Sequence, residues 1–316
     1  MNSPLTISVV IPAYNAEQTL PAALQSVMGQ AQQPREVIVV DDGSSDNTAT
    51  VAKSYRDRVR LIQQENQGSA VARQVGTEAA TSDFVAYLDA DDWWHDETLS
   101  NFHEVLEADP VHFVIADFVR AIPGAQVEQH FPRNTSFFPW FEDHLQEFGE
   151  RLNPERLTRL PVPWGLEALL LGFPYFPSAS LLRRDSVFRA GGWDHRFRRC
   201  QDFDLALRIA RLFPLHFFDE VQAIVGINEG NRDVEAYVVQ QTEGDIRVLE
   251  AHRTKYSEDP EYRRKVSRTL ARRYYSLGNV FRKAGNRSAA RKAYWSAFRW
   301  PGKRSRSFVR LLGVGF

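Results

Sequence analysis

The first 120 residues alternate short apolar runs with segments whose apolar residues recur at helical spacing. The helical segments fall at Ala16–Gly29, Asp46–Tyr55, Gly68–Ala80 and Glu97–Ala108. The apolar runs, rich in Val, Ile and Phe, predict strands at Leu5–Pro12, Glu36–Val40, Val59–Gln63, Phe84–Leu88 and His112–Phe118. Strands that alternate with helices in this way form βαβ units, so the pattern predicts a mixed, mostly parallel α/β sheet covered by helices.

The pattern changes twice further along the chain. From Ile122 to about Pro163 no period is visible, and we expect an irregular insertion with a short helix. After a helix at Asp202–Phe213 the chain becomes helical from about Gly230, and its first apolar face is Val266, Leu270, Tyr274, Leu277 and Phe281. Gly285-Asn286 breaks that helix, and Asn286 can cap a second one, with the face Ala290, Ala293, Tyr294, Ala297 and Phe298.

We therefore expect two domains. Residues 1–230 would form the α/β domain, with one half at about 1–120 and another at 121–230, and residues 231–316 a helical region. One helical hairpin cannot bury its own apolar faces, so it should pack on the larger domain or on a second copy of the chain, which makes a homo-oligomer possible.

The composition is that of a globular protein, with 43% hydrophobic and 25% charged residues. The single cysteine, Cys200, excludes an intramolecular disulfide and fits a reducing compartment. The N-terminus lacks the basic and long apolar regions of a signal peptide, and the apolar stretch Val162–Leu182 is interrupted by Glu167 and three prolines. These features predict a cytoplasmic protein.

The net charge of −1 hides a strong asymmetry. Residues 253–316 carry 18 Lys and Arg against 3 Asp and Glu, a balance of +15, which leaves −16 for the rest of the chain. Such a basic end can attract an anionic surface, or it can be a solvated helical face. Phe308, Val309, Leu311 and Leu312 beside Arg304, Arg306 and Arg310 suit an interfacial helix, so we expect peripheral membrane association rather than nucleic-acid binding.

Acidic residues follow two of the predicted strands. Asp41 and Asp42 come directly after Glu36–Val40, and Asp89-Ala90-Asp91-Asp92 comes after Phe84–Leu88. In parallel sheets ligands bind beyond the carboxyl ends of strands, where these side chains should meet. Asp41 is suited to accept hydrogen bonds from a ligand, whereas Ser44, Ser45 and Asp46 are typical of turns and helix caps.

The second acidic cluster has the chemistry of a metal site. Mg²⁺ and Mn²⁺ take one or two carboxylates together with substrate phosphates. Three aspartates within four residues repel one another, so a bound cation would relieve the cluster. A loop without metal is the alternative interpretation. Downstream, Asp202 opens a predicted helix and could be a cap or a general base.

Four ordered segments carry a resemblance to a known family. VVIPAYNAEQTL, VVDDGSSDNT, NQGSAVARQVGTEAATSDFVAYLDADD and GGWD…QDFDLALRI together resemble the inverting glycosyltransferases of family 2, over roughly residues 5–215. That resemblance implies the GT-A fold, a nucleotide-diphosphate sugar donor, a Mn²⁺ or Mg²⁺ cofactor, and a saccharide or lipid-linked acceptor. The nucleotide could be UDP, dTDP or GDP, and we expect UDP. It also implies a role in the synthesis of a surface polysaccharide or glycan.

The resemblance implies residue roles as well. Asp202, in the pair Gln201-Asp202, would be the general base, and Asp91 would bind the metal. The remaining implied donor-site residues are Pro12, Tyr14, Asn15, Asp41, Arg73, Asp89 and Ala90. Two departures stand out: no histidine lies in Ile224–Arg232, where Asn228 or Glu229 takes its place, and His195 follows GGWD, where an acidic residue is more usual. We interpret His195 as a loop residue and Cys200 as structural.

Two tryptophans are candidates for the acceptor side. Trp164 and Trp193 flank the segment Phe173–Ser180 and, with Gln201, could contact an acceptor sugar, although large aromatic residues are more often packed in cores. Two other functions remain open. One is a non-catalytic scaffold acting through the basic helices, and the other is a nucleotidyltransferase, which usually has a Gly-rich basic loop where Pro12–Asn15 has neither Gly nor Lys.

Overall fold

The computed structural model describes residues 5–121, 132–173, 175–227, 234–301 and 310. The contacts within the chain divide it into two compact units, Met1–Asn228 and Glu229–Phe316, and each is described by itself.

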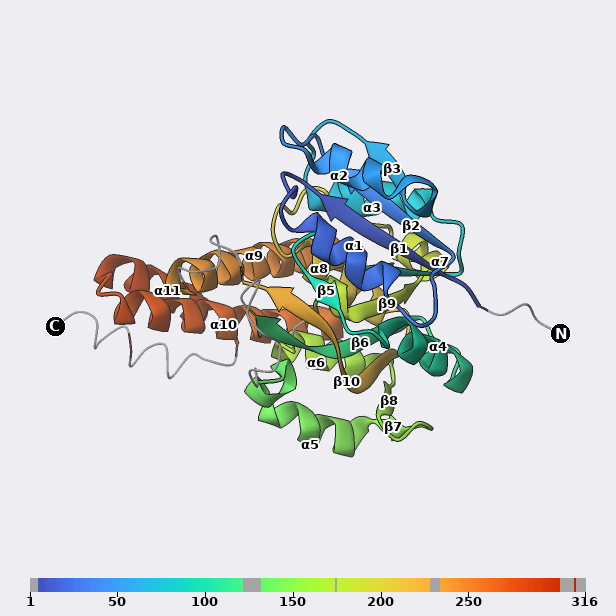
Figure 1. Ribbon diagram of the computed structural model, residues 1–316. Helices are drawn as coiled ribbons and strands as arrows, with labels where there is room; N and C mark the ends of the chain where they lie inside the picture. The colour runs from blue at the N-terminus through green and yellow to red at the C-terminus, as the bar shows by residue number, and fades with distance from the viewer. Residues whose placement is uncertain (1–4, 122–131, 174, 228–233, 302–309, 311–316) are drawn as a thin grey trace. The chain divides into compact units, whose positions relative to one another are not determined.

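The first unit is built on one twisted sheet (Figure 1). Its order is β3-β2-β1-β4-β9-β6-β10-β8-β7, with β5 paired to β10. The strands β1 to β4 run parallel to one another, and β6 and β10 are also a parallel pair, whereas β9 is antiparallel to both β4 and β6. The mixed, mostly parallel sheet that the sequence predicted is confirmed. The strands in the described residues are β1 (Ile7–Ala13), β2 (Glu36–Asp41), β3 (Arg60–Gln63), β4 (Phe84–Tyr87), β5 (Trp93–Trp94), β6 (Phe113–Ala121), β7 (Glu150–Arg151), β8 (Leu157–Leu160), β9 (Ser180–Arg183) and β10 (Leu215–Gly226).

Helices cover both faces of this sheet, and the predicted ones are present to within a few residues of the expected ends. The order of strand and helix follows the sequence pattern up to β6. The α-helices of the described first unit are α1 (Leu20–Met28), α2 (Thr48–Ser54), α3 (Ser69–Ala79), α4 (Thr98–Ala108), α5 (Pro139–Phe148), α6 (Val162–Leu171), α7 (Arg184–Arg189) and α8 (Gln201–Ala210), with 3₁₀ turns η1 (Arg56–Arg58), η2 (Asn134–Phe137) and η3 (Pro177–Ala179).

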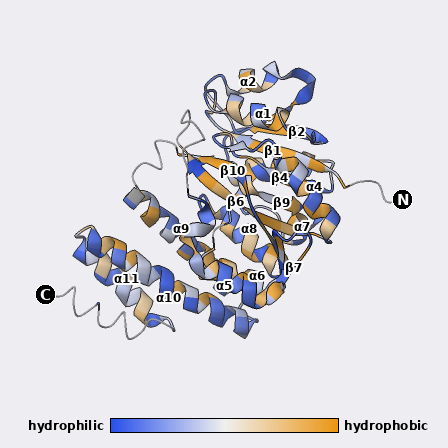
Figure 2. Ribbon diagram, turned by 60° about the horizontal axis from the view of Figure 1, so that its bottom comes forward, coloured by the Kyte–Doolittle hydropathy of each residue, from blue (hydrophilic) through white to orange (hydrophobic). Residues whose placement is uncertain are grey.

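The central strand β1 is buried on both faces because its residues alternate between two helices. Val9 and Ile11 belong to the hydrophobic core that also contains Leu20 of α1. Val10 points the other way, toward Gly76 of α3, where a β-carbon would lie 2.3 Å from a Val10 methyl carbon. Gly76 therefore lets α3 approach the sheet closely. Figure 2 shows the resulting hydrophobic strands between more polar helices.

The middle of the chain is more regular than the sequence pattern predicted, although α5 is the short helix that was expected there. The described residues of the predicted irregular insertion contain α5, β7 and β8, and α6 and β10 had no counterpart in the predicted elements. The helix α6 is buried over most of its surface, so its apolar residues show no helical period. The strand β10 is interrupted by the polar pair Asp219-Glu220, where its register to β6 shifts.

The second unit is a set of three helices, α9 (Val234–Lys255), α10 (Pro260–Lys283) and α11 (Arg287–Arg299). The predicted hairpin of α10 and α11 is confirmed, and α9 packs against α10. Asn286 caps α11 by accepting a hydrogen bond from the backbone N–H of Ala289 at 3.0 Å. Tyr294 of α11 packs over Gly278 of α10 and is fully buried. Within the described residues, no helix is both long enough and apolar enough to cross a bilayer.

Candidate active site

Loops that follow β1 and β2 are joined at the carboxyl edge of the sheet. Asn15 has a left-handed backbone (φ 47°), and its side-chain oxygen accepts a hydrogen bond from the backbone N–H of Ser45 at 2.9 Å. The backbone N–H of Asn15 in turn donates to the Ser44 hydroxyl at 2.9 Å. Pro12 is buried in β1 opposite Val40, whereas 54% of Tyr14 is exposed. Tyr14 is thus the apolar side chain of this loop that a ligand can reach.

Asp41 and Asp42 are both buried but have different surroundings. The Asp41 carboxylate accepts hydrogen bonds from the Ser44 backbone N–H at 3.1 Å and from the Gln63 side chain at 3.2 Å. Asp42 accepts from the backbone N–H groups of Gln67 and Gly68, at 2.9 and 2.8 Å, and so fixes the loop that enters α3. Asp42 is a structural residue for this loop. Asp46 has the turn chemistry expected of it, because its carboxylate accepts from the backbone N–H of Thr48, two residues further on and the first residue of α2.

The segment Asp89–Asp92 forms a tight turn at the end of β4, in which the Asp92 N–H donates to the Asp89 carbonyl at 3.0 Å. Asp92 is buried, and its carboxyl group accepts hydrogen bonds from the Gly226 N–H at 2.9 Å and from the Ser178 hydroxyl. Burial first, and then repulsion by Asp89 and Asp91, raise the pKa of Asp92 well above its ordinary value. Asp92 therefore anchors the turn, and Asp89 and Asp91 lie at its outer side, around the largely buried Ala90.

Arg73 of α3 lies against this turn. Its guanidinium forms an ion pair with the Asp89 carboxylate at 2.5 Å and is 4% exposed. Burial alone would lower the pKa of Arg73, but the negative charges of Asp89 and Asp202 raise it above its ordinary value. Within the described residues, Nε and Nη1 of Arg73 have no hydrogen-bond partner. Because an unsatisfied buried donor is costly, this cation is suited to bind an anionic or hydroxyl-rich ligand.

Asp202 lies in the first turn of α8, close enough to Arg73 for its charge to affect that side chain. The preceding Gln201 donates a hydrogen bond from its side chain to the Ser69 hydroxyl at the start of α3, at 2.8 Å. This contact ties the start of α8 to the start of α3. The structure thus brings Asp202 and Arg73, 129 positions apart in the sequence, to one site.

A small cavity of about 210 Å³ lies beside the start of α3. Gly68 and Ser69 line it on one side, and His195 and Arg198 line it on the other. His195 is exposed, as expected for a loop residue, and the neighbouring Cys200 is buried with a left-handed backbone (φ 59°). The cavity therefore lies beside the hydrogen bond between Gln201 and Ser69.

The two candidate tryptophans do not lie where acceptor contacts would need them. Trp193 is 5% exposed, and the Arg73 guanidinium lies 5.0 Å from its ring centroid. The Trp193 ring therefore packs against Arg73 in a cation–π contact. Trp164 stacks on Phe148 with ring centroids 3.7 Å apart. Its neighbour Gly165 packs on Leu215, the first residue of β10, whereas the acidic turn meets the last residue, Gly226. Trp164 is therefore at the opposite end of the strand from the site.

Ser178, Tyr175 and Gly226 also shape the site, although no sequence motif contains them. The Ser178 hydroxyl accepts from the Asp89 N–H at 3.0 Å and donates to Asp92. A side chain at Gly226 would bring a β-carbon within 2.2 Å of the Asp91 carbonyl oxygen. Burial, and to a lesser extent the charge of Asp202, raise the pKa of Tyr175. Ser178 lies in η3, Tyr175 just before it and Gly226 at the end of β10, and pattern alone did not predict these elements.

The donor set at this turn fits a hard cation that takes part of its ligands from a substrate. Asp89 and Asp91 offer carboxylate oxygens, which Mg²⁺ and Mn²⁺ prefer, and their negative charges disfavour ionisation of the neighbouring Asp92. Among the described residues no group of three or more His, Cys, Asp or Glu side chains forms a complete metal site. Asn228 and Glu229, which the resemblance puts in place of a histidine, lie outside the described residues.

Comparison with known proteins agrees with this geometry. The chain matches the model of glycosyl transferase family 2 over residues 8–159, just under half of its length. It is 43% identical over 95 residues to the uncharacterized glycosyltransferase YibD of Escherichia coli (strain K12), which is 29% of this chain and 28% of YibD. It is 40% identical over 90 residues to the UDP-Glc:alpha-D-GlcNAc-diphosphoundecaprenol beta-1,3-glucosyltransferase WfgD of Escherichia coli, which is 28% of this chain and 36% of WfgD. The matched stretch thus spans about a third of these relatives.

Solved structures share the fold over most of the chain. S. aureus TarS 1-349 in complex with UDP-GlcNAc aligns with a TM-score of 0.61 at 19% identity, over 93% of this chain and 82% of that one. The mannosyltransferase PcManGT from Pyrobaculum calidifontis, in complex with GDP-Man and Mn²⁺, aligns with a TM-score of 0.61 at 18% identity, over 98% of this chain and 79% of that one. At such identities the likeness establishes the GT-A fold.

Proposed function

We propose that this chain is an inverting glycosyltransferase that transfers a sugar from a nucleotide-diphosphate sugar to a hydroxyl group of a saccharide or lipid-linked acceptor. The observation that carries the proposal is the position of Arg73. Its buried guanidinium pairs with Asp89 on the donor side, responds to the charge of Asp202, and keeps two N–H groups without partners in the described residues. A buried guanidinium close to two carboxylates, with two N–H groups still able to donate, is suited to bind the diphosphate of a sugar donor.

The donor half would hold the nucleotide. Asp41 lies at the end of β2 with its carboxylate oriented by Ser44 and Gln63, so it can accept hydrogen bonds from a base. Tyr14 and Asn15 form the neighbouring wall, and Asp89 can accept from a ribose hydroxyl while it holds Arg73. The nucleotides bound to TarS and PcManGT, UDP-GlcNAc and GDP-Man, support a nucleotide-sugar donor. We expect UDP, the nucleotide of the WfgD donor.

The transfer is a single displacement. The acceptor oxygen forms a bond to the anomeric carbon as the bond from that carbon to the diphosphate oxygen breaks, and the acceptor proton passes to the Asp202 carboxylate. Attack from the face opposite the leaving group inverts the anomeric centre. The Arg73 guanidinium stabilises negative charge that develops on the diphosphate. Gln201 keeps the start of α8, and with it Asp202, in register with α3.

Asp91 would hold Mn²⁺ or Mg²⁺ together with the donor diphosphate. When bound there, the cation supplies positive charge to the leaving group. PcManGT contains Mn²⁺, which supports the choice of a divalent cation in this fold.

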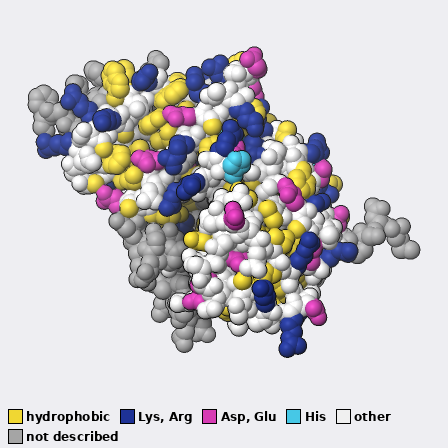
Figure 3. Space-filling view, turned by 90° about the horizontal axis from the view of Figure 1, so that it is seen from above, with side chains coloured by type: hydrophobic (Ala, Val, Ile, Leu, Met, Phe, Trp, Pro, Cys, Tyr) yellow, Lys and Arg dark blue, Asp and Glu magenta, His cyan; other side chains and the backbone are white. Residues whose placement is uncertain are grey.

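The acceptor and cellular location belong to the same proposal. WfgD is named for a diphosphoundecaprenol-linked acceptor, which supports a lipid-linked acceptor and a role in surface polysaccharide or glycan synthesis. Such an acceptor is presented at a membrane, and α11 has a face suited to one. Trp295 is 56% exposed and stacks on Phe298, among exposed Arg291, Lys292 and Arg299. Figure 3 shows Lys and Arg side chains interspersed with hydrophobic ones over these helices. The Phe308–Leu312 segment lies largely outside the described residues.

Calorimetric titration with UDP, GDP and dTDP, each with Mn²⁺ and with EDTA, tests the donor site. We expect metal-dependent binding of one nucleotide that is lost in Asp91→Ala and kept in Asp202→Asn. Binding of none of the three would contradict the donor site and favour the alternative of a non-catalytic scaffold acting through the basic helices.

A further inference from the structure

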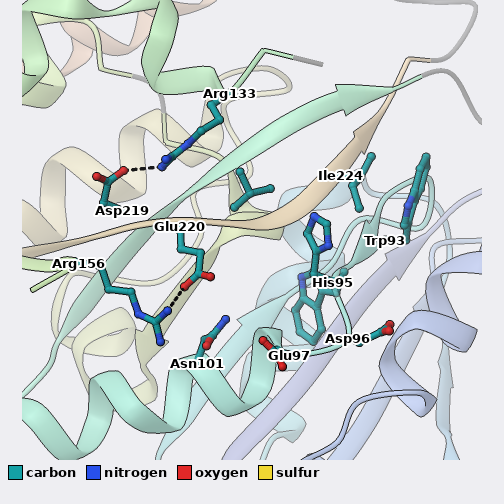
Figure 4. A pocket seen from close by; sticks show the side chains of 12 residues that line it. Trp93, His95, Asp96, Glu97, Asn101, Arg133, Arg156, Asp219, Glu220 and Ile224 are labelled. Atoms are coloured by element: carbon teal, nitrogen blue, oxygen red, sulfur yellow. Dashed lines mark hydrogen bonds and ion pairs between the residues drawn. The ribbon is translucent and has the colours of Figure 1, made fainter. Parts of the chain in front are cut away.

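A larger cavity lies next to the acidic turn, and neither the family roles nor the comparisons assign a ligand to it. It has a volume of about 1010 Å³ and lies between β5, β10 and the start of α4. Cavities of roughly 300–1,000 Å³ are typical of small-molecule sites. Figure 4 shows Trp93, His95 and Ile224 at one end and two ion pairs, Arg133–Asp219 and Arg156–Glu220, at the other. Asp96, Glu97 and Asn101 lie along the lower rim.

The cavity begins where the proposed catalytic turn ends. Trp93 follows Asp92 directly, and its strand β5 pairs with β10 through Ile224, two residues before Gly226. Gly226 is the residue whose N–H donates to Asp92. Between the lining residues Ile224 and Asp219 the strand β10 advances five residues, at most roughly 16 Å at the rise of an extended chain. The cavity is therefore long enough for more than one sugar unit, and its residue Trp93 directly follows the turn in the sequence.

The charges of the cavity exclude a phosphate ligand. Four carboxylates line it, those of Asp96, Glu97, Asp219 and Glu220, against two guanidiniums. Each guanidinium is already held by two carboxylates: Arg133 pairs with Asp117 and Asp219, and Arg156 pairs with Glu104 and Glu220. A nucleotide or a diphosphate would meet net negative charge and would have to break these pairs.

The same groups are suited to a sugar. Carboxylate oxygens accept hydrogen bonds from hydroxyl groups, and a half-buried indole such as that of Trp93 packs on the apolar face of a pyranose ring. The walls are fixed in advance: Trp94 is anchored by the bond from its Nε1–H to the Ser178 carbonyl at 2.7 Å, and Asn101 donates to the Gln222 side chain at 3.2 Å. A rigid, aromatic, carboxylate-rich cavity favours a neutral or amino-bearing saccharide.

We propose that this cavity, defined by Trp93, Glu97, Asn101, Asp219, Glu220 and Ile224, is a saccharide-binding subsite. It would hold a sugar unit of the acceptor that does not itself react, at a distance from the hydroxyl that Asp202 deprotonates. The assignment to the acceptor rests on the proposed transferase function. The binding of a saccharide to the cavity does not, because it can be measured without donor, metal or turnover.

Ligand-observed NMR and calorimetry with the intact chain, in EDTA and without nucleotide, test the subsite. The probes are cellotetraose and chitotetraose as neutral saccharides, a glucosamine tetramer as a cationic one, tetragalacturonic acid as an anionic one, and tetralysine as a cationic peptide. We expect the neutral or amino saccharides to bind and tetragalacturonic acid to bind at least tenfold more weakly. Binding of tetralysine alone, or of no saccharide, would overturn the proposal.

Variants locate the binding. Trp93→Ala should weaken it most, and Glu97→Gln and Asn101→Ala should each weaken it about threefold to tenfold, the range for one lost hydrogen bond. Trp295→Ala, an exposed tryptophan of the other unit, and Glu107→Gln, an exposed carboxylate of α4 that does not line the cavity, are the matched controls. If Trp93→Ala unfolds the protein, Glu97→Gln and Asn101→Ala, the two rim variants, still show whether the saccharide binds in this cavity. Saccharide binding that is equal in the wild type and both rim variants would overturn the assignment to this cavity.

The two proposals can fail separately. Nucleotide binding without saccharide binding would remove the subsite and leave the donor site. If the protein binds no nucleotide but binds a saccharide in a way that depends on Glu97, the subsite is supported and the proposed transferase function is contradicted.

Discussion

Arg73 lies over the ring of Trp193, with its guanidinium carbon 5.0 Å from the ring centroid. The Trp193 indole N–H donates to the Tyr87 hydroxyl at 3.1 Å, and that hydroxyl is also hydrogen-bonded to Thr77 of α3 at 2.7 Å. The segment before α8 thus supports a cation that belongs to α3 and pairs with Asp89 at the end of β4. These contacts join the two halves of the first unit. Substitution of Trp193 should therefore weaken nucleotide binding at the donor site.

We expect Trp193→Ala to weaken nucleotide binding by about 2- to 30-fold, the range of one cation–π contact. It should also lower the free energy of unfolding by about 3–5 kcal/mol, as for other large buried aromatic residues. Trp193→Phe keeps a ring under Arg73 and should lose less of both. Calorimetry below the melting temperature of each variant measures this, with Trp295→Ala as the exposed control. Unchanged affinity in folded Trp193→Ala would contradict the supporting role.

Removal of the proposed base should separate chemistry from binding. Asp202→Asn should lower kcat by about 10²–10⁴-fold, because a general base contributes that much, while the Kd for the nucleotide stays within a few-fold. Initial rates with a UDP-sugar and a competent acceptor measure it. The control is Asp185→Asn, an exposed carboxylate of α7 whose pairing with Arg189, at 3.9 Å, is worth little. Equal losses of kcat in both variants would mean that Asp202 has no special role.

Sequence pattern predicted the donor half well because its elements are regular. The strands β1, β2 and β4 are largely apolar runs with polar residues at or soon after their carboxyl ends, and α1 and α3 have one apolar face each. The motifs therefore fell at strand ends, where a ligand site was expected. Asp41 and Asp42 show the limit of this reasoning. The two adjacent carboxylates look alike in the sequence, and only the fold reveals that Asp42 is committed to the backbone of the loop before α3.

The rest of the site depends on contacts that pattern does not encode. Trp193 was expected at the acceptor because it flanks the segment Phe173–Ser180, but its ring is buried and packs against Arg73. Ser178 and Gly226 hold the acidic turn from elements whose apolar residues show no clear period. Such long-range hydrogen bonds leave no local signal, since each residue is ordinary for its own segment.

Gly226 should be intolerant of any side chain. A β-carbon there would lie 2.2 Å from the Asp91 carbonyl oxygen, so Gly226→Ala must displace the acidic turn. We expect Mn²⁺-dependent nucleotide binding to fall by at least tenfold. Gly165→Ala is the matched control, because its β-carbon would meet Leu215 at 2.7 Å, at the other end of β10. That variant should lose stability but keep nucleotide binding. Equal binding losses in the two variants would point to general unfolding instead.

Acid should destabilise the first unit through His216. Burial lowers the pKa of His216 below its ordinary value, against the opposite effects of the hydrogen bond to Asp109 (2.8 Å) and of that carboxylate's charge, and with a smaller lowering by Arg159. The folded state then binds fewer protons than the unfolded state, whose histidine titrates near pH 6.5. The stability is therefore complete above about pH 6.5 and is lost as the pH falls toward the folded pKa.

Urea unfolding between pH 7.5 and 5.5 measures this slope. His216→Gln should flatten it by at most about 1.4 kcal/mol per pH unit, the limit for one proton. His112, whose pKa burial also lowers, keeps part of the slope in both proteins. The exposed His195→Gln should leave the slope unchanged. A slope in His216→Gln as steep as in the wild type would rule out His216 as its source.

The exposed stack on α11 should determine membrane association. Trp295 and Phe298 have ring centroids 5.8 Å apart, and the exposed cations beside them can each contribute about 1 kcal/mol near an anionic surface. We expect the protein to float with phosphatidylserine-containing liposomes at low salt, and the double variant Trp295→Ser and Phe298→Ser to stay in the dense fraction. Phe188→Ser, an exposed aromatic residue of the first unit, is the control. High salt should release the wild type, because its attraction to the surface is screened beyond about 8–10 Å. Flotation that is equal for the wild type and the double variant, or equal with neutral phosphatidylcholine, would contradict a role for this face.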